Sequence, residues 1–120
     1  MKKMLVIEDD SLSQDLITRI FKNDFEIDTC ESAEEFYEKY SNNNYNIIIM
    51  DISIKGNKHG LALIKEIKAL PAFSHTPIIC LTAHAQSNIR RNAIEAGTDL
   101  FFVKPIPNKV LKEAVTSLLA

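Results

Sequence analysis

Residues Tyr45-Asn46-Ile47-Ile48-Ile49-Met50-Asp51 decide the fold, because they contain three consecutive isoleucines in an almost unbroken apolar run. Isoleucine is β-branched and favours strands, and an apolar run without polar alternation is typical of a strand covered on both faces. Strands of this kind belong to parallel sheets that carry helices on either side. The stretch therefore predicts a central strand over residues 45–50 that ends at Asp51.

Four more short strand-like runs are found along the chain, with stretches of helical periodicity between and after them. These runs are Met4–Ile7, Phe25–Cys30, Pro77–Leu81 and Leu100–Val103. Alternation of short strands with helices is the sequence pattern of βαβ units. We therefore expect an α/β protein with five strand–helix pairs, (βα)5, doubly wound around one parallel five-stranded sheet.

The ends and apolar faces of the helices can also be predicted. Ser11 with Gln14, and Ser32 with Glu35, are potential capping boxes, and Gly97 suits the end of the fourth helix. Apolar faces are expected at Leu12, Leu16, Ile17, Ile20 and Phe21 in the first helix, Phe36 and Tyr40 in the second, Leu61, Ile64, Ile67 and Leu70 in the third, and Val110, Leu111, Ala114, Val115 and Leu118 in the last.

Size, charge and cysteine content narrow the classes of protein. The 120 residues have the length of a single domain, 1–120. A formal net charge of −2 argues against direct binding to nucleic acid. The first apolar run stops at Glu8, which is too early for a signal peptide or a membrane span. Cys30 and Cys80 lie in apolar or β-branched runs, so we expect buried free thiols in a cytoplasmic protein.

Reactive side chains follow four of the five predicted strands. Glu8 and Asp9 follow the first strand, Asp51 the third, Thr82 the fourth and Lys104 the fifth. The ligand crevice of an open α/β sheet lies outside the carboxyl ends of its strands. We therefore expect these five side chains to meet at one edge of the sheet.

This set of side chains suits magnesium-assisted phosphoryl transfer. Three neighbouring carboxylates repel one another, and a hard cation with oxygen ligands keeps them ionised together. Mg²⁺ leaves coordination positions for water and phosphate oxygens, which suits a carboxylate that accepts a phosphoryl group. We expect Asp51 to be the nucleophile, while Lys104 and Thr82 hold the phosphoryl oxygens.

The residues around these positions form four motifs, each after its own predicted strand. The motifs are Val6-Ile7-Glu8-Asp9-Asp10, Ile49-Met50-Asp51-Ile52, Leu81-Thr82-Ala83 and Phe101-Phe102-Val103-Lys104-Pro105. Through them the chain resembles, over essentially its whole length, the receiver domain of two-component response regulators. The resemblance implies the flavodoxin-like receiver fold with strand order 2-1-3-4-5, and a cis bond between Lys104 and Pro105.

The resemblance also implies roles for individual residues. Asp51 would accept a phosphoryl group from a phosphohistidine. Mg²⁺, for which Mn²⁺ is expected to substitute, would be held by Asp9, Asp51 and the main-chain carbonyl of Ser53, with Glu8 acting through water. Ser53 and His84 are candidates for tuning hydrolysis of the acyl phosphate.

A conformational switch is implied as well. Thr82 would move to bond the phosphoryl group, and Phe101 would rotate inward. This would change the face built from the fourth helix, the fifth strand and the fifth helix (the α4-β5-α5 face), to which an unidentified downstream protein would bind. The phosphodonor would be a histidine kinase or a histidine phosphotransfer protein, and we expect a monomer that contacts neither nucleic acid nor membrane.

The chain departs from the common receiver pattern in two places, since Phe101 lacks the hydroxyl of the commoner tyrosine and the loop after the acceptor is unusual; the loop and two further features bear on partners. Ile54-Lys55 stands where receivers usually carry Met-Pro, and the loop Gly56–Gly60 is longer than usual, although it spares the chemical residues. The stretches Thr82-Ala83-His84-Ala85 and Lys104-Pro105-Ile106 are similar to receivers of hybrid histidine kinases and phosphorelays. The last helix lacks the arginines of receivers that dimerise above winged-helix domains.

Alternatives stay open on the sequence alone. An electron carrier of the flavodoxin type would need a hydroxyl- and glycine-rich phosphate loop where Glu8-Asp9-Asp10 stands, and an aspartyl phosphatase would place its nucleophile after the first strand. A pseudo-receiver would dock partners without being phosphorylated, and the chain could be the receiver part of a hybrid histidine kinase. Our interpretation is a signalling switch that catalyses its own phosphorylation and dephosphorylation, rather than an enzyme.

Overall fold

The computed structural model describes residues 1–52, 59–83 and 87–120. Its five strands are β1 (Lys2–Ile7), β2 (Phe25–Cys30), β3 (Ile47–Asp51), β4 (Ile78–Thr82) and β5 (Leu100–Val103). All neighbouring strands pair in parallel, in the order β2-β1-β3-β4-β5. The predicted fold class and strand order are confirmed, and the strongest apolar run forms the central strand.

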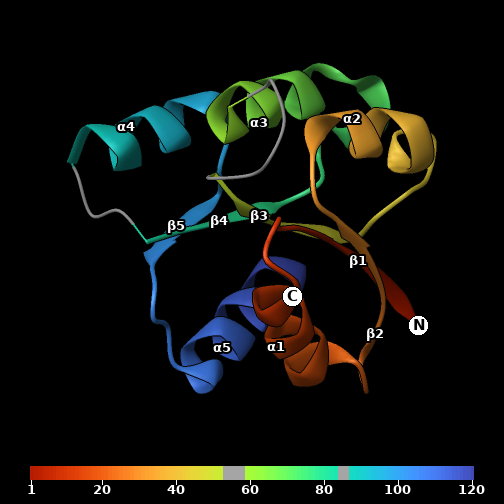
Figure 1. Ribbon diagram of the computed structural model, residues 1–120, viewed down its shortest axis with the longest axis vertical. Coiled ribbons are helices and arrows are strands. Elements are labelled where there is room, and N and C mark those ends of the chain that lie inside the picture. The colour runs from red at the N-terminus through yellow and green to blue at the C-terminus, as the bar shows by residue number, and fades with distance from the viewer. Residues whose placement is uncertain (53–58, 84–86) are drawn as a thin grey trace.

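Helices cover both faces of this sheet (Figure 1). One face carries α1 (Ser11–Phe21) and α5 (Asn108–Leu119). The other face carries α2 (Ala33–Glu35) with the π-helical turn η1 (Phe36–Tyr40), α3 (Gly60–Ala69) and α4 (Ser87–Ala96), and the 3₁₀ turn η2 (Pro71–Phe73) follows α3. Among the described residues, no helix is both long and apolar enough to cross a membrane.

Each strand divides its side chains between two hydrophobic cores, because successive strand residues point to opposite faces. Ile48 and Met50 of β3 join the core under α2, α3 and α4, whereas Ile47 and Ile49 join the core against α1 and α5. This division explains why the central strands need unbroken apolar sequence. It also fixes the face to which each residue at the strand ends points.

The start of α1 differs from the prediction. The N-cap is Asp10 and not Ser11, since the Asp10 carboxylate accepts hydrogen bonds from the Ser13 N–H at 3.0 Å and the Ser13 hydroxyl at 2.9 Å. Gln14 takes no part in a capping box, and its side chain bonds the main-chain oxygen of Glu8. An aspartate is at least as good an N-cap as a serine, so Asp10 can cap the helix one position before Ser11.

Some of the predicted apolar faces are too wide. Ile17 and Phe21 of α1 are buried, but Leu12 is 67% exposed and Leu16 is 53% exposed. Val110 of α5 is likewise 41% exposed, while Leu111 beside it is buried. A surface helix buries only the stripe that faces the sheet, so apolar residues outside that stripe stay in contact with water.

The second helix begins as predicted and continues differently. The Ser32 hydroxyl accepts a hydrogen bond from the Glu35 N–H at 3.1 Å, which confirms the cap. After Glu35 the chain widens into η1, where the Ser41 N–H bonds the Phe36 carbonyl at 2.8 Å. Phe36 is fully buried, as predicted, and the four-residue spacing to Tyr40 gave no sign of the wider turn.

Candidate functional site

The carboxyl edge of the sheet collects the residues that the sequence singled out. Asp51 and Thr82 are the last residues of β3 and β4, and Glu8 and Lys104 immediately follow β1 and β5. Glu8 is 2% exposed and Asp51 is 8% exposed. Two carboxylates that are so nearly removed from water require positive partners.

The first positive partner is Lys104. Its Nζ lies 2.7 Å from Oε1 of Glu8 and 2.9 Å from Oδ2 of Asp51. The main chain holds this residue in place, because the Lys104 N–H donates to the carbonyl of Thr82 at 2.7 Å. The Lys104–Pro105 bond is cis, as the resemblance implied.

A second positive partner is called for by the acidic cluster. Glu8, Asp9 and Asp51 each offer one carboxylate oxygen, and these oxygens lie within 4.8 Å of one another. With all three ionised, the carboxylates and the Lys104 ammonium leave two negative charges, which one divalent cation would balance. An all-oxygen donor set of this kind fits Mg²⁺. Ser53, the other ligand expected from the resemblance, lies outside the described residues.

Burial and charge compete over the protonation of the cluster. The pKa of Glu8 is raised to about 7, because burial and the neighbouring Asp51 together raise it by more than the hydrogen bond from Lys104 lowers it. The pKa of Lys104 is raised as well, because its hydrogen bonds to Glu8 and Asp51 outweigh the effect of its burial. Lys104 is therefore charged at neutral pH, and a cation bound among the carboxylates would favour ionised Glu8.

Thr82 and Phe101, the two residues expected to form the switch, belong to the face of the sheet that carries α3 and α4. Phe101 is paired in register with Cys80, and both belong to the core under α3 and α4, as does Ala93 of α4. Thr82, two residues after Cys80, shares this face by strand alternation and is fully buried. The carboxylates therefore lie toward the face of the sheet that carries α1, whereas Thr82 and Phe101 lie toward the face that carries α4. His84 lies outside the described residues.

The loop that carries the acids is tied to its neighbours by contacts that the sequence did not reveal. The Glu8 N–H donates to the Cys30 carbonyl of β2 at 2.7 Å. The Glu8 carbonyl accepts from Nε2 of Gln14 at 2.5 Å. The spacing of the two residues does not predict this second contact, because Glu8 lies outside α1.

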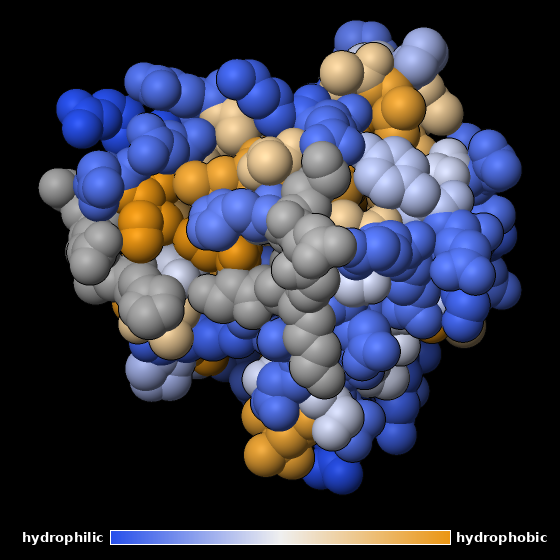
Figure 2. Space-filling model, turned by 45° about the horizontal axis from the view of Figure 1, so that its top comes forward, coloured by the Kyte–Doolittle hydropathy of each residue, from blue (hydrophilic) through white to orange (hydrophobic). Residues whose placement is uncertain are grey.

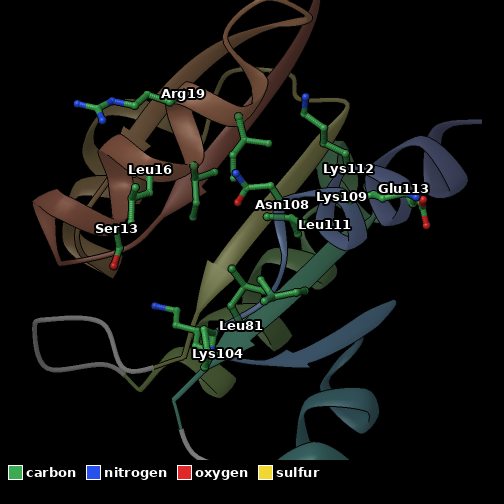
Figure 3. A pocket seen from close by; sticks show the side chains of 14 residues that line it. Ser13, Leu16, Arg19, Leu81, Lys104, Asn108, Lys109, Leu111, Lys112 and Glu113 are labelled. Carbon is green, nitrogen blue, oxygen red and sulfur yellow. The ribbon is translucent and has the colours of Figure 1, made fainter.

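A groove of about 940 Å³ lies between α1 and α5 and reaches Lys104 at one end (Figure 3). Its walls include the apolar residues Leu16, Ile17, Ile20, Ile106 and Leu111 and the basic residues Arg19, Lys109 and Lys112. This groove could not be predicted from the sequence, because only the tertiary structure brings the first and last helices together.

The sheet order, the acidic cluster and the lysine at the end of β5 define an α/β signalling module of the receiver class. Residues 4–116 match the family model of the response regulator receiver domain. This chain belongs to that family.

Individual relatives agree with this assignment. The chain is 34% identical to hybrid signal transduction histidine kinase I of Dictyostelium discoideum, over 97% of this chain but 7% of that protein. It is 29% identical to the chemotaxis protein CheY of Halobacterium salinarum, over 98% of this chain and 97% of that one. The chain thus spans a small part of one relative and nearly all of the other.

A solved structure agrees in fold. The receiver domain of the sensor histidine kinase PA1611 from Pseudomonas aeruginosa superimposes with a TM-score of 0.88, covering 98% of this chain and 97% of that one at 23% identity. That structure holds a magnesium ion in its active-site cleft.

Proposed function

We propose that this chain accepts a phosphoryl group on Asp51 from the phosphohistidine of a histidine kinase or a histidine phosphotransfer protein, in a Mg²⁺-dependent reaction. The observation that carries the proposal is the position of Lys104, whose ammonium bonds both Asp51 and Glu8 beside Asp9. An acceptor carboxylate, a cation for the transferred oxygens and an oxygen-rich cluster for a metal are the parts that phosphoryl transfer requires.

In this reaction an oxygen of the Asp51 carboxylate forms a bond to phosphorus as the bond from phosphorus to the imidazole nitrogen breaks. The electron pair of the broken bond stays on the imidazole. Lys104 moves its hydrogen bond from Asp51 toward an oxygen of the transferred group and stabilises the charge that develops there. The hydroxyl of Thr82 takes another of these oxygens.

Asp9, Asp51 and the Ser53 carbonyl would hold Mg²⁺, and Glu8 would act on it through water, with Mn²⁺ as an acceptable substitute. The ion supplies electrostatic stabilisation of the phosphoryl oxygens when bound. The magnesium ion in the related receiver of PA1611 supports this choice of metal. Ser53 and His84 would tune the later hydrolysis of the acyl phosphate.

Phosphorylation would be read out on the α4-β5-α5 face. Thr82 would be drawn toward the phosphoryl group, and the packing of Phe101, which already lies in the core on the same face of the sheet, would change with it. Exposed apolar side chains, Ile94 of α4 and Val103 of β5, offer contacts for a downstream protein. Apolar surface gathers on the side of the molecule where α4 lies (Figure 2).

The phosphodonor would dock along the groove between α1 and α5. This groove ends at Lys104, so a protein seated in it could bring its phosphohistidine to Asp51. Leu12 and Leu16 are exposed on α1, and a helix packed along α1 would cover both of them. Arg19, Lys109 and Lys112 would pair with acidic residues of that helix. The chain would act in the cytoplasm as a monomer or as part of a longer hybrid kinase.

The test is the intact mass of the chain after incubation with acetyl phosphate or phosphoramidate, with and without Mg²⁺, beside an Asp51→Asn variant. A single Mg²⁺-dependent phosphoryl adduct that is absent from Asp51→Asn is the expected result. If the wild-type chain forms no adduct and binds no Mg²⁺, a docking module without phosphorylation takes the place of this proposal.

A further inference from the structure

Two of the acids of the site, Glu8 and Asp9, lie on a short loop, and one side chain of α1 is hydrogen-bonded to the peptide group between them. The carbonyl oxygen of Glu8 belongs to the peptide group that joins Glu8 to Asp9, and it accepts the hydrogen bond from Nε2 of Gln14 at 2.5 Å. Because the peptide group is planar, its orientation is coupled to the ψ torsion of Glu8 and the φ torsion of Asp9. The direction of the Asp9 side chain therefore depends on this orientation.

The remaining contacts of the loop do not replace this bond. The Glu8 N–H is fixed by Cys30 of β2, which holds the preceding peptide group. Asp10 is fixed by Ser13 through the helix cap, and the Asp10 N–H donates to Oε2 of Glu8 at 3.3 Å; these contacts hold the peptide group that follows Asp9 and the Glu8 carboxylate. Among the described contacts, the Glu8–Asp9 peptide group is thus held through its carbonyl by Gln14 alone.

We propose that Gln14 is a positioning residue for the metal site: its side-chain amide holds the Glu8–Asp9 peptide group in the orientation in which the carboxylates of Glu8, Asp9 and Asp51 converge on one cation. This inference rests on the proposed function. Groups that orient the ligands of a metal typically change its affinity by 10- to 100-fold when they are removed.

The variant Gln14→Leu keeps the approximate volume and removes the donor. We expect its dissociation constant for Mg²⁺, measured by isothermal titration calorimetry, to rise by about tenfold. Gln14→Glu, which sets an acceptor against the carbonyl, should weaken binding at least as much. Ser13→Ala is the matched control, because it removes one hydrogen bond from the same turn of α1, to Asp10, and leaves the Glu8 carbonyl contact intact.

A merely structural role would lower thermal stability without changing the metal affinity, so the melting temperature is measured on the same samples. The chain contains two glutamines, so selective ¹⁵N-glutamine labelling yields two side-chain amide pairs, and the pair lost in Gln14→Leu is assigned to Gln14. In the wild type we expect this pair to shift during Mg²⁺ titration along the same binding curve as the calorimetry.

The inference is overturned if wild type and Gln14→Leu bind Mg²⁺ equally, or if Ser13→Ala weakens binding as much as Gln14→Leu. A Gln14 amide that does not respond to Mg²⁺ would also overturn it. In each of these outcomes the wild-type chain still binds Mg²⁺, so the proposed function survives. A wild-type chain that binds no Mg²⁺ removes both.

Discussion

The Nζ of Lys104 lies 2.9 Å from Oδ2 of Asp51, so the proposed acceptor carboxylate and the ammonium that would stabilise its product are already hydrogen-bonded. The same ammonium also bonds Glu8. The Lys104 ammonium is therefore shared between the carboxylates of Glu8 and Asp51 before any phosphoryl group arrives.

Replacing this ammonium should separate chemistry from metal binding. We expect Lys104→Gln to slow formation of the acyl phosphate from acetyl phosphate by on the order of 100-fold, because a fixed donor to the transferred oxygens is lost. Its affinity for Mg²⁺ should not fall, since a positive charge has left the neighbourhood of the cluster. The control is Lys109→Gln, a lysine of the same groove with no described contact to the acids. Equal rates in wild type and Lys104→Gln would exclude the role.

The cluster should cost stability in the absence of metal. Asp9 lies within 4.8 Å of two other carboxylates, and the Lys104 ammonium bonds those two. At pH 8 without Mg²⁺ we expect Asp9→Asn to raise the free energy of unfolding by about 1 kcal/mol, through relief of repulsion between like charges. Urea denaturation measures this difference.

Excess Mg²⁺ should reverse the order, because only the wild type then gains stability from binding the ion. The exposed helix residue Asp15, changed to Asn, removes the same charge outside the cluster and serves as control. If Asp9→Asn and Asp15→Asn respond alike to Mg²⁺, the cluster is not a metal site.

The start of α3 should tolerate no side chain. The Gly60 N–H donates to the Ile52 carbonyl at 3.2 Å, and a methyl group on Gly60 would lie 2.6 Å from that oxygen and closer still to the Ile52 Cα. We expect Gly60→Ala to lower the free energy of unfolding by about 2 kcal/mol or more, although alanine favours helices. The reverse change Ala62→Gly, at an exposed position of the same helix, should cost about 1 kcal/mol. A Gly60→Ala protein as stable as the wild type would contradict the close approach.

The two thiols should make the protein sensitive to alkali. Burial raises the pKa of both Cys30 and Cys80 to about 12, from an ordinary value of 9.0. The unfolded chain loses these protons first as the pH rises, so the free energy of unfolding falls between pH 9 and pH 12. From pH 8 to pH 10 we expect a loss of about 1 kcal/mol for each thiol.

The double variant Cys30→Ala/Cys80→Ala should lose that share of the pH dependence. In the same pH range, a thiol-reactive dye should modify neither cysteine rapidly until denaturant is added. Fast modification of the folded protein would show that the thiols are accessible.

The docking groove should matter to protein phosphodonors and not to small ones. Leu16 is 53% exposed on α1, so Leu16→Glu should leave folding unchanged. We expect it to slow phosphoryl transfer from a histidine phosphotransfer protein by at least tenfold, since a charge would meet the apolar face of the partner helix. Phosphorylation by acetyl phosphate should keep its rate. If Leu16→Glu slowed phosphorylation by both donors equally, the defect would lie in the phosphorylation site around Asp51 and not in docking.

The sheet, and the side chains that meet at its carboxyl edge, could be predicted because the strands carry strong local signals. Short apolar runs located four of the strands and an alternation of apolar and polar residues located β2, and the parallel fold then brought Glu8, Asp51 and Lys104 to one edge. The faces of α1 could not be predicted in the same way. Leu12 and Leu16 fit a helical apolar stripe, and only the packing of α1 beside α5 shows that they lie outside it.

The start of α1 and the turn η1 could not be predicted, because the sequence allows alternatives of nearly equal stability at both places. Asp10 and Ser11 are both good caps, and the hydrogen bonds of Asp10 to Ser13 decide between them. The turn η1 depends on a shift of one residue in hydrogen bonding at Ser41, which side-chain periodicity does not encode.

The ion pair between Glu8 and Lys104 joins residues 96 positions apart in the chain. During synthesis on the ribosome, the first acid of the site therefore emerges long before its lysine is made. Until β5 has joined the edge of the sheet, the carboxylates lack the cation that bonds Asp51. A nascent or truncated chain would thus be a poor phosphoryl acceptor, and competence to receive a signal would itself report that the whole chain has folded.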